Sequence, residues 1–482
     1  MTSPRLVCVF ALLALCGCAS MPKNESVAAA ASHLPSAWRA SNASADTAAL
    51  AQWWDSFADA PLRALLDKAL ARNYDLKAAI ERTRQARAQS SIARSSLFPE
   101  LDVGANASRQ RSHLPPPVGI ASDVGVGVSG TWVVDVFGGN QLAALAATAQ
   151  AEATNEARRD FEVALMANVA TAYMQLRGLQ RQRAILDENI AVRADTLDLT
   201  QVRYRAGLAT DLDVARAQTQ LQQAQASVPG IEQQIDDHLG ALAVLSGDPP
   251  ESIERALLDA GAIPPVSPLL PHSAPGDVLE RRPDLRGAER RIDAAAASLG
   301  AAKAELLPKF MLSFSGSIDR LAYRGLPPVT DHLFNIGLGI FWPLFNAGRI
   351  HANIAAHDAA LREAEYAFDQ ALLNALQDVE SAYTDVRAQR ERGARLTRAV
   401  DSARRSSTLA QALYEAGEAD FLSVLDAHTQ LLDTQRDLVQ AQTDAAVSAV
   451  SLYRALGGGW PDTGEEPAQP RLSAKHGGPS DE

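Results

Sequence analysis

The sequence contains a tandem duplication of one large unit, and this duplication constrains the fold more than any other feature. Matching segments recur about 210 residues apart along most of the chain. Leu97-Phe98-Pro99 returns as Leu306-Leu307-Pro308, and Thr219-Gln220-Leu221 returns as Thr429-Gln430-Leu431. The period is too long for a solenoid of small repeats. We therefore expect a tandem duplication in which each copy folds in the same way.

Each unit ends in two long segments that favour helix. No proline occurs between Asn140 and Val228, or between Arg349 and Trp460, and alanine, glutamine, arginine and leucine dominate there. Within the two repeats, 58–246 and 278–457, we predict long helices at 140–206, 210–245, 348–415 and 420–456. A helix over 140–206 would be roughly 100 Å long at 1.5 Å per residue. Such helices need lateral partners to be stable, so antiparallel pairs are expected.

Four short stretches alternate between apolar and polar residues, at about 99–110, 124–137, 308–319 and 333–345. Each has the length of a tilted membrane strand, with one apolar and one polar face. An open sheet edge is not tolerated in hydrocarbon, and the smallest membrane barrels have about eight strands. Several copies would have to combine their strands, and three copies would supply twelve. The alternation alone equally permits a soluble, half-exposed antiparallel sheet.

The N-terminus reads as a processing segment. Leu6–Leu15 is an apolar run that suits a signal peptide and is too short to span a bilayer. It leads into Gly17-Cys18-Ala19, which resembles the bacterial lipobox. That resemblance implies a signal peptide at 1–17, a lipidated extension at 18–57, and Cys18 carrying S-diacylglycerol and an N-acyl chain. Ala19 is not the aspartate that retains lipoproteins in the inner membrane. An ordinary signal peptide with incidental cysteines is the alternative.

Several classes of function are excluded by composition. The chain has 482 residues and a net charge of −12, which disfavours nucleic acid as a partner. All three cysteines lie within the first eighteen residues, so the body has no disulfide and no thiolate chemistry. The G-x-G-x-x-G match at Gly125–Gly130 lies inside an alternating run and is interpreted as small lumen-side residues, not a dinucleotide loop. No metal spacing or nucleophile motif appears, so we expect neither an enzyme nor a cofactor.

Two further segments are rich in proline and glycine. The stretch 247–277 contains seven prolines and is interpreted as an extended linker between the repeats. The tail 458–482 is predicted to be disordered. No stretch beyond the N-terminus reaches eighteen consecutive apolar residues, so no transmembrane helix is expected.

Several motifs resemble those of the TolC-like outer-membrane efflux channels, in the NodT/OprM-like lipoprotein branch. They are Arg282-Pro283-Asp284-Leu285, Pro343-Leu344-Phe345-Asn346-Ala347-Gly348-Arg349, Leu242-Ala243-Val244-Leu245-Ser246-Gly247 and Leu456-Gly457-Gly458-Gly459-Trp460. The similarity extends over almost the whole mature chain. One position departs from the pattern: Gly139-Asn140 follows Gly138 where relatives usually carry arginine.

The resemblance implies a mainly α fold with a small β part. It implies a homotrimer with a twelve-stranded β-barrel in the outer membrane, continuous with a twelve-helix tunnel that closes at a periplasmic tip. The tip would be the turns at 206–211 and 416–420. Leu422 and Asp426 match the family's constricting rings and share a helical face, with Asp420 just before them. Arg216, the repeat counterpart of Asp426, is a possible ion-pair partner for the closed gate, although Thr429 stands where relatives often have a basic residue.

The implied function is a passive duct of a tripartite efflux system that exports small molecules, such as drugs and toxic organic compounds. Its partners would be outer-membrane lipid, a periplasmic membrane-fusion adaptor and an inner-membrane pump of the resistance-nodulation-division or major-facilitator type. A type I protein secretion duct is an alternative within transport. A lipid-anchored periplasmic coiled-coil scaffold without a pore is the alternative outside it.

Overall fold

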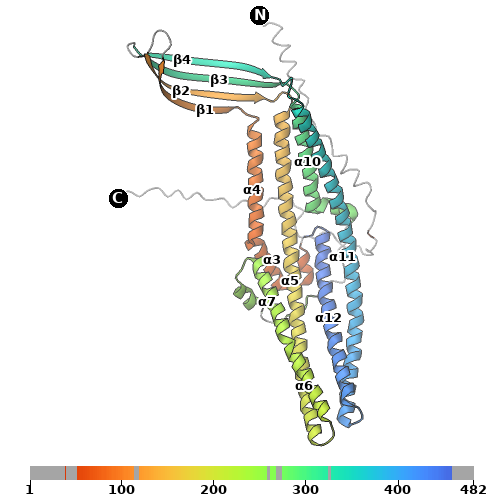
Figure 1. Cartoon of the computed structure of the whole chain (residues 1–482). Coiled ribbons are helices and arrows are strands. Elements are labelled where there is room, and N and C mark those ends of the chain that lie inside the picture. Colours follow the sequence, from red (N-terminus) through yellow and green to blue (C-terminus); the bar gives the residue numbers. More distant parts are fainter. Residues whose placement is uncertain are drawn as a thin grey trace, which may run out of the picture.

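The computed structural model describes Trp38 and residues 52–112, 119–257, 261–266, 274–323 and 327–458. The predicted signal peptide 1–17, Cys18 and the tail beyond Gly458 lie outside these residues. The described body is elongated, with a four-stranded sheet at one end and two helical hairpin tips at the other (Figure 1).

The order of elements shows the duplication directly. The first unit consists of the 3₁₀ turn η2 (Trp53–Phe57), α3 (Ala60–Arg72), α4 (Tyr74–Ser95), β1 (Glu100–Ser112), β2 (Gly119–Val134), α5 (Gly139–Arg205), α6 (Asp211–Ala226), α7 (Val228–Ser246) and α8 (Pro250–Leu257). The second consists of α9 (Pro275–Arg281), α10 (Pro283–Ala304), β3 (Lys309–Tyr323), β4 (Val329–Phe341), α11 (Arg349–Ala416) and α12 (Phe421–Ala455). The expected mainly helical fold with a small β part and a duplicated order of elements is confirmed.

The two longest helices begin in the same way. α5 has 67 residues and α11 has 68, and each starts after a glycine in the left-handed region, Gly138 at φ +74° and Gly348 at φ +84°. A side chain at these positions would be strained, so glycine permits the sharp strand-to-helix corner. At the first corner, Asp135 Oδ2 accepts a hydrogen bond from the Gln141 amide in the first turn of α5, at 2.7 Å.

Two expectations about helices are wrong in detail. The segment expected as one helix at 210–245 is broken at Ser227, because Pro229 lies in the first turn of α7 and cannot continue a helix from α6. The stretch 247–277 is not simply extended. It contains α8, which begins at Pro250, and the start of α9 at Pro275. Proline suits the first helical position, and burial of Ile253 and Leu257 holds α8 against the core.

The sheet is antiparallel in the order β1-β2-β3-β4, so β1 and β4 are its two edges. Directly opposed residues share a face, and the register therefore merges the apolar sides of all four strands into one surface, called here the apolar face. Its members include Leu101, Val103, Val124, Val126, Val128, Phe310, Leu312, Phe314, Ile318, Phe334, Ile336, Leu338 and Ile340. The opposite, polar face carries serines, asparagines and aspartates.

The glycine motif lies within β2, and one of its glycines is not where we expected it. Gly125 and Gly127 are on the polar face, but Gly130 is opposite Leu101 and Phe314 on the apolar face. A methyl group on Gly130 would approach the Phe314 ring to 2.3 Å. This glycine therefore makes room for an aromatic ring, and it is not a lumen-side residue.

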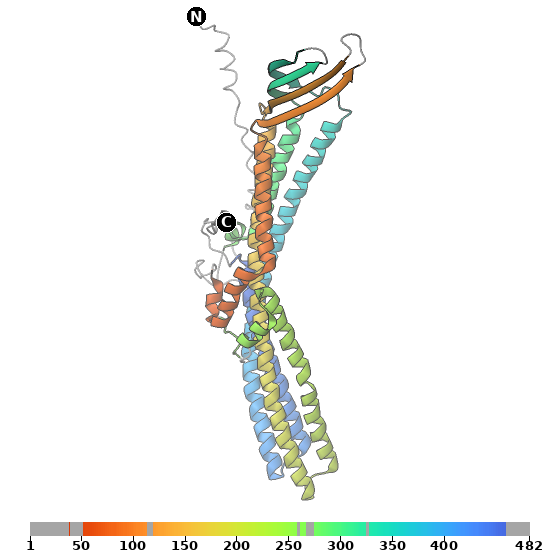
Figure 2. The same cartoon turned by 90° about the vertical axis from the view of Figure 1, so that its left-hand side faces the viewer.

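The main core lies midway along the body, where α3, α5, α7, α11 and α12 meet (Figure 2). Tyr173 is fully buried there, and its hydroxyl donates to Asp59 Oδ1 at 2.9 Å. Arg177 Nε donates to the Tyr173 oxygen at 3.0 Å. Burial raises the pKa of Tyr173 to about 12, so the phenol stays protonated and keeps this bond. The network ties the N-terminal helices to the long helix α5.

A glycine follows α7 in the first unit and α12 in the second, and each glycine packs against the first helices of its own unit. Gly247 follows α7 at φ +68°, and Gly457 follows α12 at φ +73°. A Cβ on Gly247 would lie 2.7 Å from the Arg72 carbonyl oxygen, and one on Gly457 would lie 3.1 Å from the Arg281 carbonyl carbon. Both contacts are with backbone at the break between two helices, so neither neighbour can rotate away.

Gly247→Ala is expected to destabilise the protein by about 2 kcal/mol or more, because a left-handed alanine and a backbone clash add together. Thermal unfolding of the purified protein in detergent measures the effect as a lowered Tm. Gly393→Ala is the matched control: this glycine lies within α11 with open space around it, so the change should be neutral or stabilising. Equal Tm values for the two variants would contradict this explanation.

Candidate functional site

The helical tips consist of two turns, each with a left-handed glycine. Gly207 has φ +72° between α5 and α6, and Gly417 has φ +82° between α11 and α12. Thr210 and Asp213 form a capping box at the start of α6. At the start of α12, Asp420 Oδ1 accepts hydrogen bonds from the Ser423 amide at 2.9 Å and the Ser423 hydroxyl at 2.6 Å. These bonds lower the pKa of Asp420. The side chain of Asp420 is thus used as a helix cap.

The predicted constriction residues lie on the free side of α12. Leu422 is 46% exposed, and Asp426, one turn further along, is also exposed. On the opposite side, Phe421 and Val424 are buried against Ala217 of α6 and Tyr414 of α11. The buried side fixes the rotation of α12, so an aliphatic and an acidic side chain face away from the chain's own helices.

Arg216 is also exposed, on α6. Among the residues that the structure describes, no ion pair within the chain joins Arg216 to Asp426. An ion pair between them therefore requires two different copies of the chain, and it stays a proposal.

One tip residue was not singled out from the sequence. Arg203 of α5 lies over the Tyr414 ring, 4.6 Å from the ring centre, and its NH1 donates to the Tyr414 carbonyl oxygen at 2.8 Å. This contact joins the end of α5 to the end of α11. A signal was present: the tyrosines at 204 and 414 match between repeats, whereas Arg203 is replaced by Leu413, so the tip of the first repeat alone has this cation.

A histidine lies just behind the constriction. His428 of α12 lines a small cavity with Arg193 and Thr196 of α5 and Gln220 of α6. Arg193 NH1 donates to the Gln220 carbonyl oxygen at 3.2 Å. Burial lowers the pKa of His428, and the charge of Arg193 lowers it further. The neutral imidazole is therefore favoured in the folded tip.

Acidification is expected to weaken the packing of α12 on α5 and α6. The unfolded chain binds the proton of His428 near its ordinary pKa of 6.5, while the folded chain resists it, so stability falls as pH decreases below about 6.5. We expect His428→Asn to reduce the loss of Tm between pH 7.5 and pH 5.5, as measured by thermal unfolding at both values. His351→Asn, on α11, is the control. An identical pH dependence in wild type and His428→Asn would contradict this role.

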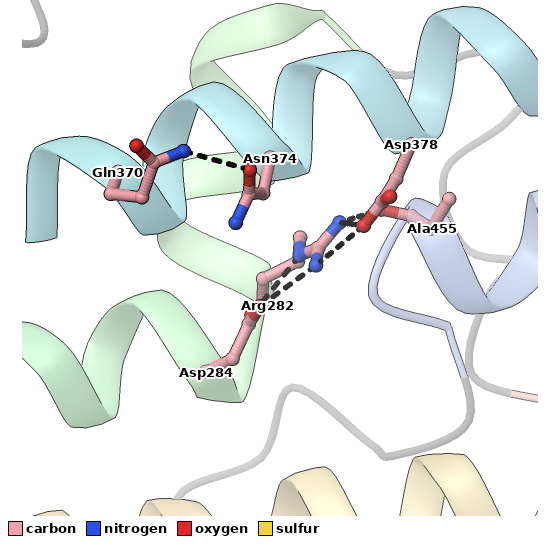
Figure 3. Close-up of polar contacts among 6 residues, drawn as sticks. All are labelled: Arg282, Asp284, Gln370, Asn374, Asp378 and Ala455. Atoms are coloured by element: carbon pink, nitrogen blue, oxygen red, sulfur yellow. Dashed lines mark hydrogen bonds and ion pairs between the residues drawn. The ribbon is translucent and has the colours of Figure 1, made fainter. Parts of the chain in front are cut away.

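A second polar cluster joins three helices of the second repeat in the middle of the body (Figure 3). Arg282, between α9 and α10, donates through NH2 to Asp284 Oδ2 at 2.7 Å and to Asp378 Oδ2 of α11 at 3.2 Å. Its NH1 donates to the Ala455 carbonyl oxygen at the end of α12, at 3.4 Å. Burial opposes the charge of Arg282, but the hydrogen bond and charge of Asp284 raise its pKa above the ordinary value. One guanidinium thus connects three helices.

The edges of the described body are apolar and unpaired within the chain. Val103 on β1 is 77% exposed and Leu338 on β4 is 70% exposed. On α4, whose outer side has no helix beside it, Ile92 is 72% exposed. Within the described residues, no helix has the length and hydropathy needed to cross a bilayer. No group of histidine, cysteine and carboxylate side chains suited to a metal ion occurs among those same residues.

The chain matches the family model described as outer membrane efflux protein, over residues 65–248 and 274–458. The two matched segments correspond to the two repeats, without the segment that carries α8.

Named relatives have similar length. The chain is 31% identical over 470 residues to the pyoverdine export outer membrane protein OpmQ of Pseudomonas aeruginosa, covering 95% of this chain and 97% of OpmQ. It is 30% identical over 467 residues to the solvent efflux pump outer membrane protein SrpC of Pseudomonas putida, covering 94% and 97%.

Solved structures of channels share the fold. The outer-membrane channel OprN superposes with a TM-score of 0.82 at 29% identity, covering 92% of this chain and 99% of OprN. The outer membrane protein VceC of Vibrio cholerae gives a TM-score of 0.77 at 28% identity, covering 85% and 99%.

Proposed function

Because this chain belongs to the outer membrane efflux protein family, we propose that three copies close into one passive duct through the outer membrane. The proposal is based on the sheet, which has one continuous apolar face and whose edge strands β1 and β4 have no strand partner among the described residues. Unpaired backbone groups cost several kcal/mol each in hydrocarbon. Pairing of β4 with β1 of a neighbouring copy removes both edges, and three copies give twelve strands.

The register of β4 against β1 of a neighbouring copy can be inferred from the internal repeat, because β2 and β3 pair in the same way within the chain. Trp132 and Trp342 are equivalent, because each donates its indole N–H to the carbonyl of an equivalent leucine, Leu97 and Leu306, at 3.0 Å. Within the chain, Gly130 of β2 lies opposite Phe314 of β3. In the repeat, Gly130 corresponds to Ile340 and Phe314 corresponds to Ala105. The same pairing between two copies would therefore place Ile340 of β4 opposite Ala105 of β1 in the neighbouring copy. Both belong to the apolar face, so the transferred register keeps that face continuous around the barrel.

A cysteine pair at Ile340 and Ala105 is expected to cross-link copies of the protein into a covalent trimer under mild oxidation. The body contains no other cysteine, so background linkage is absent. On a denaturing gel the product should run at about three times the mass of the reduced monomer.

The matched control pairs Ile340→Cys with Leu101→Cys. Leu101 is on the same face but four residues from Ala105, about 13 Å along the strand, beyond disulfide reach. If only the control pair forms the cross-link, the proposed register is wrong. If the Ile340/Ala105 pair gives only monomers, the proposed closure between copies is wrong.

The duct has no energy source among its described residues, so we propose that it acts with a periplasmic membrane-fusion adaptor and an inner-membrane pump of the resistance-nodulation-division or major-facilitator type. Relatives are named for pyoverdine export and for solvent efflux. The cargo proposed here is accordingly small organic molecules. Cells lacking the gene should accumulate more of a small lipophilic cationic dye, and the wild-type gene should reverse this. Unchanged dye accumulation together with lost secretion of a protein would indicate a type I secretion duct instead.

We also propose that Cys18 carries the lipid anchor. The support is the Leu15-Cys16-Gly17-Cys18 sequence at the end of the apolar run. Mass spectrometry of the mature N-terminal peptide should show a triacylated cysteine, and labelled palmitate should not enter a Cys18→Ala variant. An unmodified mature N-terminus beginning elsewhere would contradict the anchor.

A further inference from the structure

Charge is sorted between the two faces of the sheet. Within the four strands, every carboxylate lies on the polar face: Glu100, Asp102, Asp123, Asp319 and Asp331. The arginines lie on the apolar face, with Arg109 and Arg111 on β1 and Arg320 on β3. His332 on β4 shares this face, opposite Ile318. The apolar face therefore carries basic groups and no acidic group.

The basic groups all lie at the same end of the sheet, beyond most of the apolar residues and close to the two hairpin connections. On β1 the apolar positions end at Ala107, and Arg109 and Arg111 follow on that face. On β3 Ile318 is the last large apolar residue of the face, and Arg320 follows it, opposite Val124 of β2. The other end of each strand leads into the long helices (Figure 1).

The spacing places these arginines at the border of the hydrocarbon. From Phe310 to Arg320 the strand extends about 33 Å at 3.3 Å per residue, which is about 25 Å of height at a tilt of roughly 40°. This equals the usual height of the apolar band of a membrane barrel, about 25 Å. At the helical end the same band is bordered by Trp132 and Trp342, as expected for an interface.

The guanidinium groups of these arginines are also accessible to a phosphate group. Arg109, Arg111 and Arg320 are exposed, and none of them makes an ion pair or a side-chain hydrogen bond to another residue in the described part of the chain. An unpaired guanidinium beside lipid is costly in hydrocarbon and favourable beside phosphate, which it binds in a bidentate manner.

We propose that Arg109, Arg111 and Arg320 form a phosphate-binding belt for the phosphorylated glycolipid of the outer leaflet. The proposal rests on the proposed function, because it requires the apolar face to point outward to lipid and the hairpin ends to lie at the cell surface. The β4–β1 register adds that Arg109 of one copy lies opposite Ile336 of its neighbour. Each belt segment therefore borders a junction between copies, where a bound lipid contacts both.

The test is titration of the purified full-length protein in neutral detergent with bisphosphorylated lipid A, followed by native mass spectrometry and by thermophoresis. We expect R109Q/R111Q/R320Q to weaken the apparent affinity by about tenfold or more, since each basic side chain near an anionic surface contributes a several-fold factor. Affinity of the wild type should fall with added salt. Dephosphorylated lipid A should bind the wild type and the variant equally weakly.

The control variant R398Q/R404Q/R405Q removes the same charge from exposed positions of α11 and should bind lipid A like the wild type. Single-channel recording of each preparation reports on the pore separately: absent conductance in the wild type would count against the duct and not against the belt. The belt is overturned if R109Q/R111Q/R320Q conducts like wild type and binds lipid A with unchanged affinity. It is also overturned if millimolar inorganic phosphate displaces the lipid completely, because the site would then recognise the free ion.

Discussion

Replacing Leu422 with serine and Asp426 with asparagine will raise the single-channel conductance of the purified protein, at least roughly twofold, and will reduce its preference for cations. Three copies bring three leucines and three aspartates close to one axis if α12 faces the lumen, as its free side indicates. In the proposed trimer the leucines would narrow the pore and the carboxylates would repel anions. Planar bilayer recordings with a potassium chloride gradient measure both quantities.

Leu212→Ser is the matched control, because Leu212 is the repeat counterpart of Leu422 and is also exposed, at 56%. It should leave conductance unchanged. Unaltered conductance in the Leu422/Asp426 double variant would contradict the gate.

The same recordings test the ion pair between copies. If Arg216 of one copy holds Asp426 of another, Arg216→Gln alone should raise conductance, and the exchanged pair R216D/D426R should lower it again towards the wild-type value. If R216D/D426R keeps a raised conductance, Arg216 and Asp426 do not form this ion pair. That result would not contradict a constriction formed by Leu422 and Asp426.

Replacing Arg282 with alanine will destabilise the protein by about 1–3 kcal/mol, because buried hydrogen bonds are lost while the carboxylates of Asp284 and Asp378 stay 32% and 55% exposed to water. The side chain of Arg282 is only 13% exposed, and its loss leaves the carboxylates of Asp284 and Asp378 close together without a cation. The end of α12 also loses a donor at the Ala455 carbonyl. Thermal unfolding in detergent, combined with the yield of folded oligomer, measures the effect.

Two further variants separate charge from geometry. Arg282→Lys should recover only part of the stability, because an ammonium cannot make the forked contacts that the guanidinium makes with two carboxylates. Arg362→Ala is the control: Arg362 forms an exposed pair with Asp358 one turn away on α11, and such pairs contribute less than about 1 kcal/mol. Equal Tm values for Arg282→Ala and Arg362→Ala would show that the contacts of Arg282 do not stabilise the fold more than an exposed ion pair does.

The parts of the fold that follow local rules could be predicted from the sequence. Alternation of apolar and polar residues marked the strands, and the proline-free stretches marked α5 and α11. The four-residue spacing placed Leu422 and Asp426 on one face, and the structure leaves that face exposed. These features depend on residues close together in the chain.

The features that could not be predicted depend on distant contacts. Arg203 is explained only by Tyr414, which lies 211 residues away. Alternation alone would have placed Gly130 on the face of Val128, but its contact with the Phe314 ring became clear only from the pairing of β2 with β3. The helix α8 was hidden by the prolines around it, because its stability comes from burial of Ile253 and Leu257 against the first repeat. The break after α6 could have been expected from Pro229 alone.

The four strands of one chain make up one third of the proposed twelve-stranded barrel, so no pore exists until identical copies complete it. The mass of the purified, detergent-solubilised protein should be determined by native mass spectrometry, and the same sample should be inserted into planar bilayers. We expect a complex of three chains with a stable, ohmic conductance. A monomer that inserts and remains non-conducting would contradict it.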